Sequence, residues 1–120
     1  MNGMPKNGNG PVPMPMKRFE IWLVRLDPVE GSEMRKARPS VVLSPDVMND
    51  RLRTVLIAPL TSGGFTAPFR VPCRFANVNG QIALDHLRGV DKARLVRRLG
   101  RLDATQAKTI LAVLVEMFSE

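Results

Sequence analysis

The chain has 120 residues and a formal net charge of +7, from 18 Lys and Arg against 11 Asp and Glu. One domain is expected at this length, and a basic surface rich in arginine favours a polyanionic partner, nucleic acid first and an acidic protein segment second. The single cysteine, Cys73, excludes an internal disulfide. One cysteine, one histidine and few clustered carboxylates form no recognisable metal set, so no metal or cofactor is expected.

The chain shows no signal for a membrane or for export. No apolar run approaches the roughly 20 residues of a membrane span, and the N-terminus has no apolar core of the kind found in signal peptides. We therefore expect a cytoplasmic protein. Residues 1–16 are dominated by Gly, Pro, Asn and Met without a hydrophobic period, which predicts a disordered tail before a domain over residues 17–120.

Three apolar segments near the start of the domain predict strands, over Phe19–Leu26, Pro39–Ser44 and Arg53–Leu60. The first is apolar on both faces and should be buried on both sides. The third is apolar almost throughout, which predicts a central position. Residues 45–50 contain turn-forming residues and are interpreted as a connection.

The loop between the first two strands is polar and carries three cations, Arg35, Lys36 and Arg38. Because Pro39 disfavours the helical region for the residue before it, Arg38 should be extended where the second strand begins. A charged side chain on a loop backed by a rigid element is typical of functional sites. The alternative is an ordinary solvated loop.

The middle of the chain predicts short strands joined by turns. Residues 67–71 suggest a strand, and Asn79-Gly80 is a type I′ turn signal that would pair residues 74–76 with residues 81–84. Such a series indicates a small all-β barrel or sandwich.

The last part of the chain contains one ambiguous segment and one clear helix. Residues 88–102 place leucines at a spacing that slightly favours a helix, although Gly100 argues against it. After them, Asp103 and Gln106 form a pattern like a capping box. An apolar stripe follows, which predicts a helix over Ala104–Met117 docked on the sheet.

Taken in order, these segments resemble the MazF/PemK toxins of bacterial toxin–antitoxin modules. The resemblance is carried by Lys17–Trp22, Leu26-Asp27-Pro28, Gly31-Ser32-Glu33, Arg38-Pro39-Ser40-Val41-Val42, Val55–Thr61 and Leu99–Leu102. Two positions depart from the pattern, because Phe19 replaces the usual Gly and His86 stands where the family often has Gln.

The resemblance implies a mainly β (α+β) fold, namely a small SH3-like or CcdB-like barrel of five to six strands with a C-terminal helix packed on the sheet. It implies a strand, rather than a helix, over Leu95–Leu102, and usually a homodimer. It also implies a metal-independent endoribonuclease that cuts single-stranded RNA at short sequences and is inhibited by an antitoxin with an acidic, disordered tail.

The resemblance places Arg38 beside Thr61 as the catalytic pair. An arginine fork can hold two phosphate oxygens in the transition state, and Thr61 can donate a hydroxyl hydrogen bond to the same phosphate. The alternatives are that Arg38 forms an ion pair that fixes the loop and that Thr61 bonds its own turn. The expected products are a 2′,3′-cyclic phosphate and a 5′-OH end.

Further residues are expected to bind the RNA or to move its protons. The candidates for substrate binding are Ser32, Glu33, Arg35, Lys36 and Ser62. Candidates for the general base are Glu33, Asp85 and His86, with Glu33 ranked above His86. Phe65 would either stack on an unpaired base or anchor its loop. A basic band (Arg94, Arg97, Arg98 and Arg101) would track RNA, bind the antitoxin or line a dimer edge.

Two other functions are compatible with the sequence. A gyrase-poisoning toxin of the CcdB type would share the fold without catalysis, but such toxins act through a C-terminal tail with Trp, which this chain lacks. An inactive module that binds RNA or antitoxin would need the same basic surface.

Overall fold

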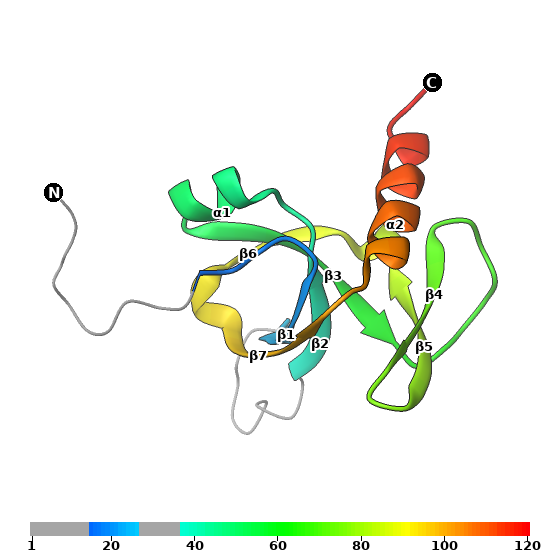
Figure 1. The fold of residues 1–120 in the computed structure, drawn as a ribbon, viewed down its shortest axis with the longest axis horizontal. Coiled ribbons are helices and arrows are strands. Elements are labelled where there is room, and N and C mark those ends of the chain that lie inside the picture. Colours follow the sequence, from blue (N-terminus) through cyan, green and yellow to red (C-terminus); the bar gives the residue numbers. More distant parts are fainter. Residues whose placement is uncertain (1–14, 27–36) are drawn as a thin grey trace, which may run out of the picture.

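The computed structural model describes residues 15–26 and 37–120 (Figure 1). The elements are β1 (Glu20–Arg25), β2 (Ala37–Val42), α1 (Asp46–Arg51), β3 (Thr54–Thr61), β4 (Arg70–Phe75), β5 (Val78–Ala83), η3 (Leu84–His86), β6 (Arg88–Asp91), η4 (Lys92–Arg94), β7 (Leu95–Arg101) and α2 (Ala104–Met117). Most of the predicted tail, residues 1–14, lies outside the described residues. Met16 was assigned to that tail, but it is buried.

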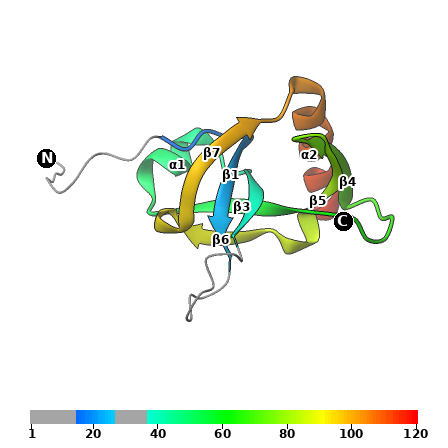
Figure 2. The ribbon, with the colours of Figure 1, turned by 90° about the horizontal axis from the view of Figure 1, so that it is seen from below.

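The strands form one antiparallel sheet in the order β4-β5-β3-β2-β1-β7, and β6 pairs with β3 outside this path. The sheet curls into a half-barrel, and α2 packs beside the β4–β5 hairpin (Figure 2). This arrangement confirms the predicted mainly β fold with a C-terminal helix on the sheet. No helix in the described ranges is long and apolar enough to cross a membrane.

The central strands are buried on both faces because two hydrophobic clusters lie on opposite sides of them. The first core cluster includes Ile21, Val41 and Ala58 and extends to Ile110 of α2. The second includes Val24, Val42 and Ile57 and is closed by Met16 and Trp22, among others. Adjacent residues of one strand therefore enter different clusters, as expected for a strand whose side chains alternate. The predicted two-sided burial of β1 is confirmed.

The connection over residues 45–50 forms a helix, α1, which the turn composition did not predict. Its Asn49 is buried, donates from Nδ2 to the carbonyls of Ser44 and Met16 at 2.9 and 3.1 Å, and accepts from the Ser44 hydroxyl. A buried amide satisfied in this way stabilises the short helix, which is too short to be stable by itself.

The hairpin between β4 and β5 was predicted, but in the wrong register, because residues 74–76 were expected to pair with residues 81–84 whereas Arg70–Phe75 pairs with Val78–Ala83. The separate strand predicted over residues 67–71 overlaps only the start of β4. The turn lies at Ala76 and Asn77, whose φ angles are 55° and 62°. Gly80 instead lies inside β5, opposite Cys73. It is needed there because a Cβ atom at this position would lie 2.4 Å from the carbonyl oxygen of Thr61.

The segment that periodicity slightly favoured as a helix is the strand β7, as the resemblance implied. Leu95 belongs to the second core cluster, whereas Leu99 and Leu102 pack with the first. The pairing of β7 with β1 also shifts register twice. Because the leucines of β7 pack in two different clusters, their spacing resembles that of a helix. This explains why periodicity slightly favoured a helix over these residues.

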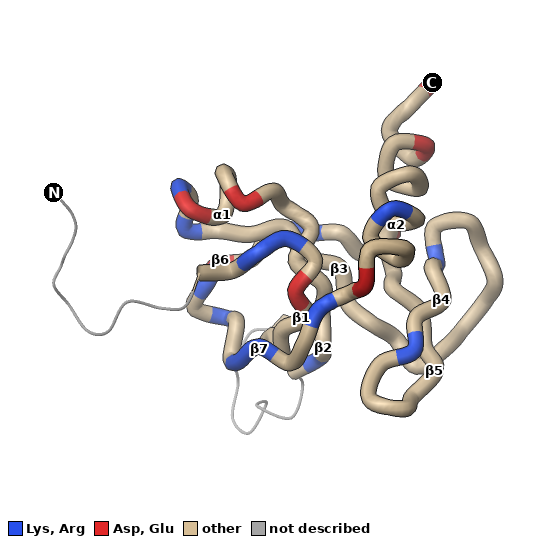
Figure 3. The backbone as a smooth tube through the Cα atoms, viewed as in Figure 1, with Lys and Arg blue, Asp and Glu red and all other residues tan. Residues whose placement is uncertain are grey.

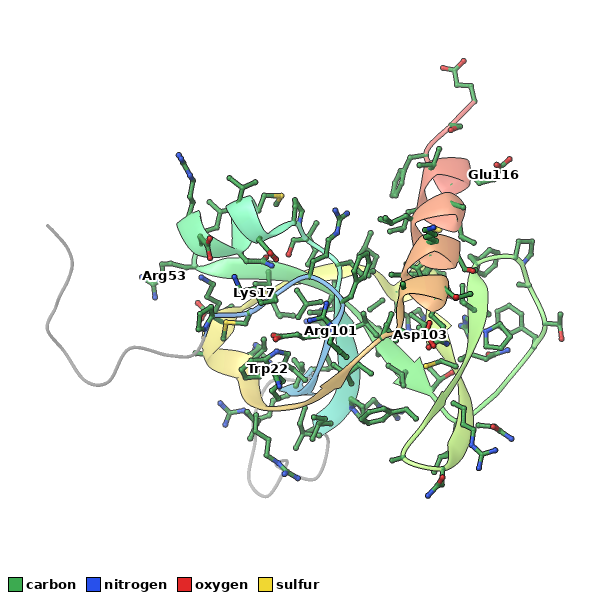
Figure 4. The ribbon with its side chains drawn as sticks, viewed as in Figure 1. Lys17, Trp22, Arg53, Arg101, Asp103 and Glu116 are labelled. Carbon is green, nitrogen blue, oxygen red and sulfur yellow. The ribbon has the colours of Figure 1, made fainter. Side chains whose placement is uncertain are left out.

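Helix α2 has the predicted bounds, Ala104–Met117. The carboxylate of Asp103, labelled in Figure 4, accepts a hydrogen bond from the backbone N–H of Gln106 at 2.8 Å. The side chain of Gln106 does not complete a capping box, because its Nε2 donates to the carbonyl of Pro72 on β4. This bond and the burial of Ile110 dock the helix.

Phe19, the residue that replaces the family's glycine, has a φ of 73°. Non-glycine residues rarely adopt this left-handed conformation. Its N–H donates to the carbonyl of Val42 at 2.7 Å and its carbonyl accepts from the N–H of Leu102 at 2.9 Å. The partly buried ring packs against the first core cluster, so side-chain burial offsets the backbone strain.

Substitution of Gly80 by alanine should destabilise the protein by about 1–3 kcal/mol, because the new methyl group meets the Thr61 carbonyl and the strands must separate. Gly89→Ala is the matched control, since its nearest neighbour across the sheet would be a side-chain atom of Leu56 at 3.6 Å. Urea unfolding followed by circular dichroism measures both. Equal stabilities of the two variants would contradict the close approach of β5 to β3.

Candidate active site

A pocket with a volume of about 610 Å³ opens where β2 begins and β3 ends. Its lining comes from β2, β3, η3, β6 and the segments that flank them: Leu26, Arg38, Pro59, Thr61, Ser62, Gly63, His86, Leu87 and Arg88. Two arginines, two hydroxyls and one imidazole are thus brought together. None of the described lining residues is a carboxylate, so the pocket is suited to an anion.

Arg38 is held by its strand and is exposed at the pocket. Its backbone pairs with Val24 of β1, and Ser40 pairs with Pro59 of β3. If this antiparallel register continued for two residues beyond that pair, towards the start of β2 and the end of β3, Arg38 would lie opposite Thr61. Within the described ranges Arg38 has no salt-bridge partner, so no described carboxylate competes for its guanidinium.

Thr61 is the last residue of β3, and both it and Ser62 line the pocket. The Thr61 hydroxyl donates to the carbonyl of Gly63 at 3.3 Å, so it bonds its own turn, as the alternative interpretation expected. That bond is long for a hydroxyl donor. The Thr61 hydroxyl can rotate to donate to a ligand in the pocket instead.

Asp85 and His86 belong to η3, a short turn anchored by the fully buried Leu84. Both oxygens of Asp85 accept from Arg70, at 2.6 Å from Nε and 2.9 Å from the second guanidinium nitrogen. This hydrogen bonding lowers the pKa of Asp85 and raises that of Arg70. Asp85 therefore stays ionised and is a poor proton acceptor, which argues against it as the general base.

His86 lines the pocket, and its Nε2 lies 3.6 Å from Oδ2 of Asp85. Its side chain is 58% exposed. The sequence ranked it below Glu33, which lies outside the described residues. Arg88, which also lines the pocket, was missed; its position two residues after His86 was the only available signal.

Phe65 is exposed, and the Arg70 guanidinium lies 4.4 Å from the centre of its ring. The rings of Phe65 and Phe69 are arranged edge to face, with a centroid distance of 6.1 Å. Gln81 holds the loop by donating to the Phe65 carbonyl at 3.0 Å. The residue is thus anchored, as one interpretation expected, and it still presents ring surface to solvent.

Four of the predicted substrate-binding residues, Ser32, Glu33, Arg35 and Lys36, lie outside the described residues. The basic band is spread over η4 and β7, along which several blue segments are visible in Figure 3. One of its members, Arg98, forms a salt bridge at 3.0 Å with Glu20, whose side chain is buried. That carboxylate also accepts from Trp22 Nε1 at 3.0 Å, so Arg98 helps to satisfy a buried charge.

No group of three or more potential metal-ligating side chains is found in the part of the chain that the structure describes. The described residues thus form a curled β half-barrel with two arginines in the pocket at the end of β3. The profile of the PemK-like, MazF-like toxins of type II toxin–antitoxin systems matches residues 17–118. The chain therefore belongs to this family, which confirms the resemblance.

Individual relatives agree with that assignment. The chain is similar to endoribonuclease PemK of Escherichia coli, with 37% identity over 102 residues that cover 80% of this chain and 77% of the relative. It resembles the solved toxin MazF-mt6 of Mycobacterium tuberculosis with a TM-score of 0.70, at 24% identity and covering 82% and 95% of the two chains. A mycobacterial endoribonuclease solved with its cognate antitoxin has the same fold, with a TM-score of 0.70, 21% identity and coverage of 83% and 91%.

The pair formed by Arg70 and Asp85 should make the protein sensitive to acid. A carboxyl group whose pKa is lowered on folding contributes stability at neutral pH and loses it as the pH falls below the ordinary range near 4. The Asp85→Asn variant should therefore lose less stability than the wild type between pH 7 and pH 3. The measurement is the urea midpoint at both pH values, with Asp50→Asn, an exposed carboxylate of α1, as the control. The same decline in the Asp85→Asn variant and the wild type would contradict the effect.

Proposed function

We propose that the protein is a metal-independent endoribonuclease toxin that cleaves single-stranded RNA at short sequences. The products would be a 2′,3′-cyclic phosphate and a 5′-OH end. The observation that carries the proposal is that Arg38 and Thr61 line one pocket that contains a second arginine and no described carboxylate. Membership of the toxin family and the similarity to PemK support the same reaction.

Arg38 stabilises the reacting phosphate. When the 2′-oxygen attacks phosphorus, negative charge accumulates on the non-bridging oxygens, and preorganised donors aimed at such charge are often the largest catalytic contribution. The planar guanidinium can donate to two of these oxygens, and the Thr61 hydroxyl can donate to one. Arg88, which also lines the pocket, adds positive potential that favours binding of the phosphate before the reaction.

The RNA on either side of the phosphate is bound by the pocket rim and by residues that precede β2 in the sequence. Ser62 contributes a neutral donor at the rim. Ser32, Glu33, Arg35 and Lys36 directly precede the strand that carries Arg38 in the sequence, so we assign them to substrate binding. Phe65 offers an exposed ring on which an unpaired base can stack.

We also propose that the protein forms a homodimer in the cytoplasm and is inhibited by an acidic antitoxin. Its charge of +7 is complementary to an acidic segment, and a structural neighbour was solved with its cognate antitoxin. The end of α2 exposes Val115 and Phe118, and these apolar side chains are available to a second copy of the chain.

Arg38→Ala should reduce cleavage of single-stranded RNA by about 100- to 1,000-fold, because it removes the donors to the developing charge. Cleavage by the wild type should persist in EDTA. Mapping the 5′-OH ends of the products measures activity and cleavage site together. Arg38→Lys should also lose most of the activity, since an ammonium cannot form the two-pronged contact.

Arg53→Ala is the matched control for Arg38→Ala. Arg53 is an exposed arginine just before β3, at the opposite end of this strand from Thr61 (Figure 4). Its removal changes the net charge equally but should leave kcat unchanged. Full activity of a folded Arg38→Ala protein would overturn the mechanism. A wild type that binds RNA and leaves it intact would identify an inactive binding module.

Phe65→Ala should weaken RNA binding, because stacking of a base on an aromatic ring contributes about 1–3 kcal/mol. Phe65→Trp keeps an aromatic surface and should retain affinity. Fluorescence anisotropy with a labelled oligonucleotide measures both variants at fixed salt. Equal affinities of Phe65→Ala and the wild type would leave Phe65 with only its role as a loop anchor.

A further inference from the structure

The contacts of the pocket reduce the number of candidates for the group that accepts the proton in the proposed reaction. Cleavage requires a group that takes the proton of the 2′-OH while the 2′-oxygen attacks. Arginine remains protonated in proteins, so Arg38 and Arg88 are unsuited to this task. Asp85 is held ionised by two hydrogen bonds from Arg70. His86 is the one titratable lining residue in the described ranges that is not an arginine.

We propose that His86 is the general base of this ribonuclease and that Asp85 is its positioning residue. The inference rests on the proposed function and concerns the same pocket. The Nε2 atom of His86 faces Asp85 at 3.6 Å, which is longer than a hydrogen bond, although such contacts are often long without substrate. With its proton on Nε2, the imidazole has Nδ1 as the acceptor.

The Arg70–Asp85 ion pair fixes the position of the carboxylate that His86 faces. Arg70 is nearly buried, with 9% of its side chain exposed, and it donates a hydrogen bond to each Asp85 carboxylate oxygen. The carboxylate therefore cannot swing away from η3, and it stays beside the imidazole of His86. The other charged groups that line the pocket with His86 in the described ranges are Arg88 from β6 and Arg38 from β2, whereas β3 contributes the uncharged Pro59 and Thr61.

The step balances without a redox partner. The 2′-OH proton passes to Nδ1 of His86 as the bond between the 2′-oxygen and phosphorus forms. The bond between phosphorus and the 5′-oxygen breaks, and that oxygen takes a proton from a water molecule. The imidazolium then returns its proton to the hydroxide ion left by this water.

The test is the pH dependence of kcat/KM for a single-stranded RNA in EDTA. In the wild type, kcat/KM should fall as the pH decreases within the range from about 5 to 8 in which histidines change charge. His86→Gln keeps a polar side chain without a titrating nitrogen. It should lose about 100-fold or more in kcat and should show no such limb. Because the side chain is exposed, its urea midpoint should match that of the wild type.

Two further variants separate catalysis from structure. His86→Ala should regain cleavage when imidazole is added to the buffer, which a merely structural histidine would not allow. Asp85→Asn should lower kcat more than it raises KM, because the imidazole loses the fixed carboxylate that positions it.

The outcomes also distinguish this inference from the proposed function. If the wild type cleaves RNA and Arg38→Ala does not, the proposed function stands. If His86→Gln then retains the wild-type rate and pH profile, His86 is not the base and the inference is overturned. If the wild type itself does not cleave RNA, the proposed function is wrong, and the inference that rests on it is overturned as well.

Discussion

The pairing of β3 with β5 is the constraint on which the site depends. Two residue pairs, Leu60 with Ile82 and Thr61 with Gln81, join the β4–β5 hairpin to the rest of the sheet. Because η3 follows β5 directly, this joint also brings His86 to the pocket at the end of β3. The two backbones approach closely at Gly80, where a Cβ atom would lie 2.4 Å from the carbonyl oxygen of Thr61. A side chain at this position of β5 would therefore prevent the pairing.

The strands that frame the pocket are held in place by burial on both faces. Val41 and Val42 are adjacent in β2, and each is fully buried in a different core cluster. Burying such a side chain stabilises the fold by about 1.5–3 kcal/mol. Any tilt of β2 would expose one cluster or overpack the other. Arg38 therefore projects from a rigid element, so the proposed contact with a phosphate would cost little conformational entropy of the backbone.

Features of the fold with a local cause could be predicted from the sequence, and features with a distant cause could not. The start of α2 depends on Asp103 and residues just after it, and its predicted bounds were correct. Asn79-Gly80 is a sequence typical of a turn, but a glycine is needed at position 80 because the Thr61 carbonyl of another strand lies against it. The leucines of β7 have helical spacing because Leu95 enters one core and Leu99 the other.

The same distinction applies to the candidate site. The resemblance named Arg38 and Thr61, whereas nothing in the sequence indicates that Arg70 binds Asp85, fifteen residues further on. That contact changes the chemistry, because it commits Asp85, which precedes the lining residue His86, to an ion pair. The pocket keeps the positive potential that attracts a phosphate, and the anionic side of the pair faces the imidazole of His86. In the proposed mechanism, this ion pair keeps Asp85 charged, and the neighbouring His86 is the group that would exchange a proton.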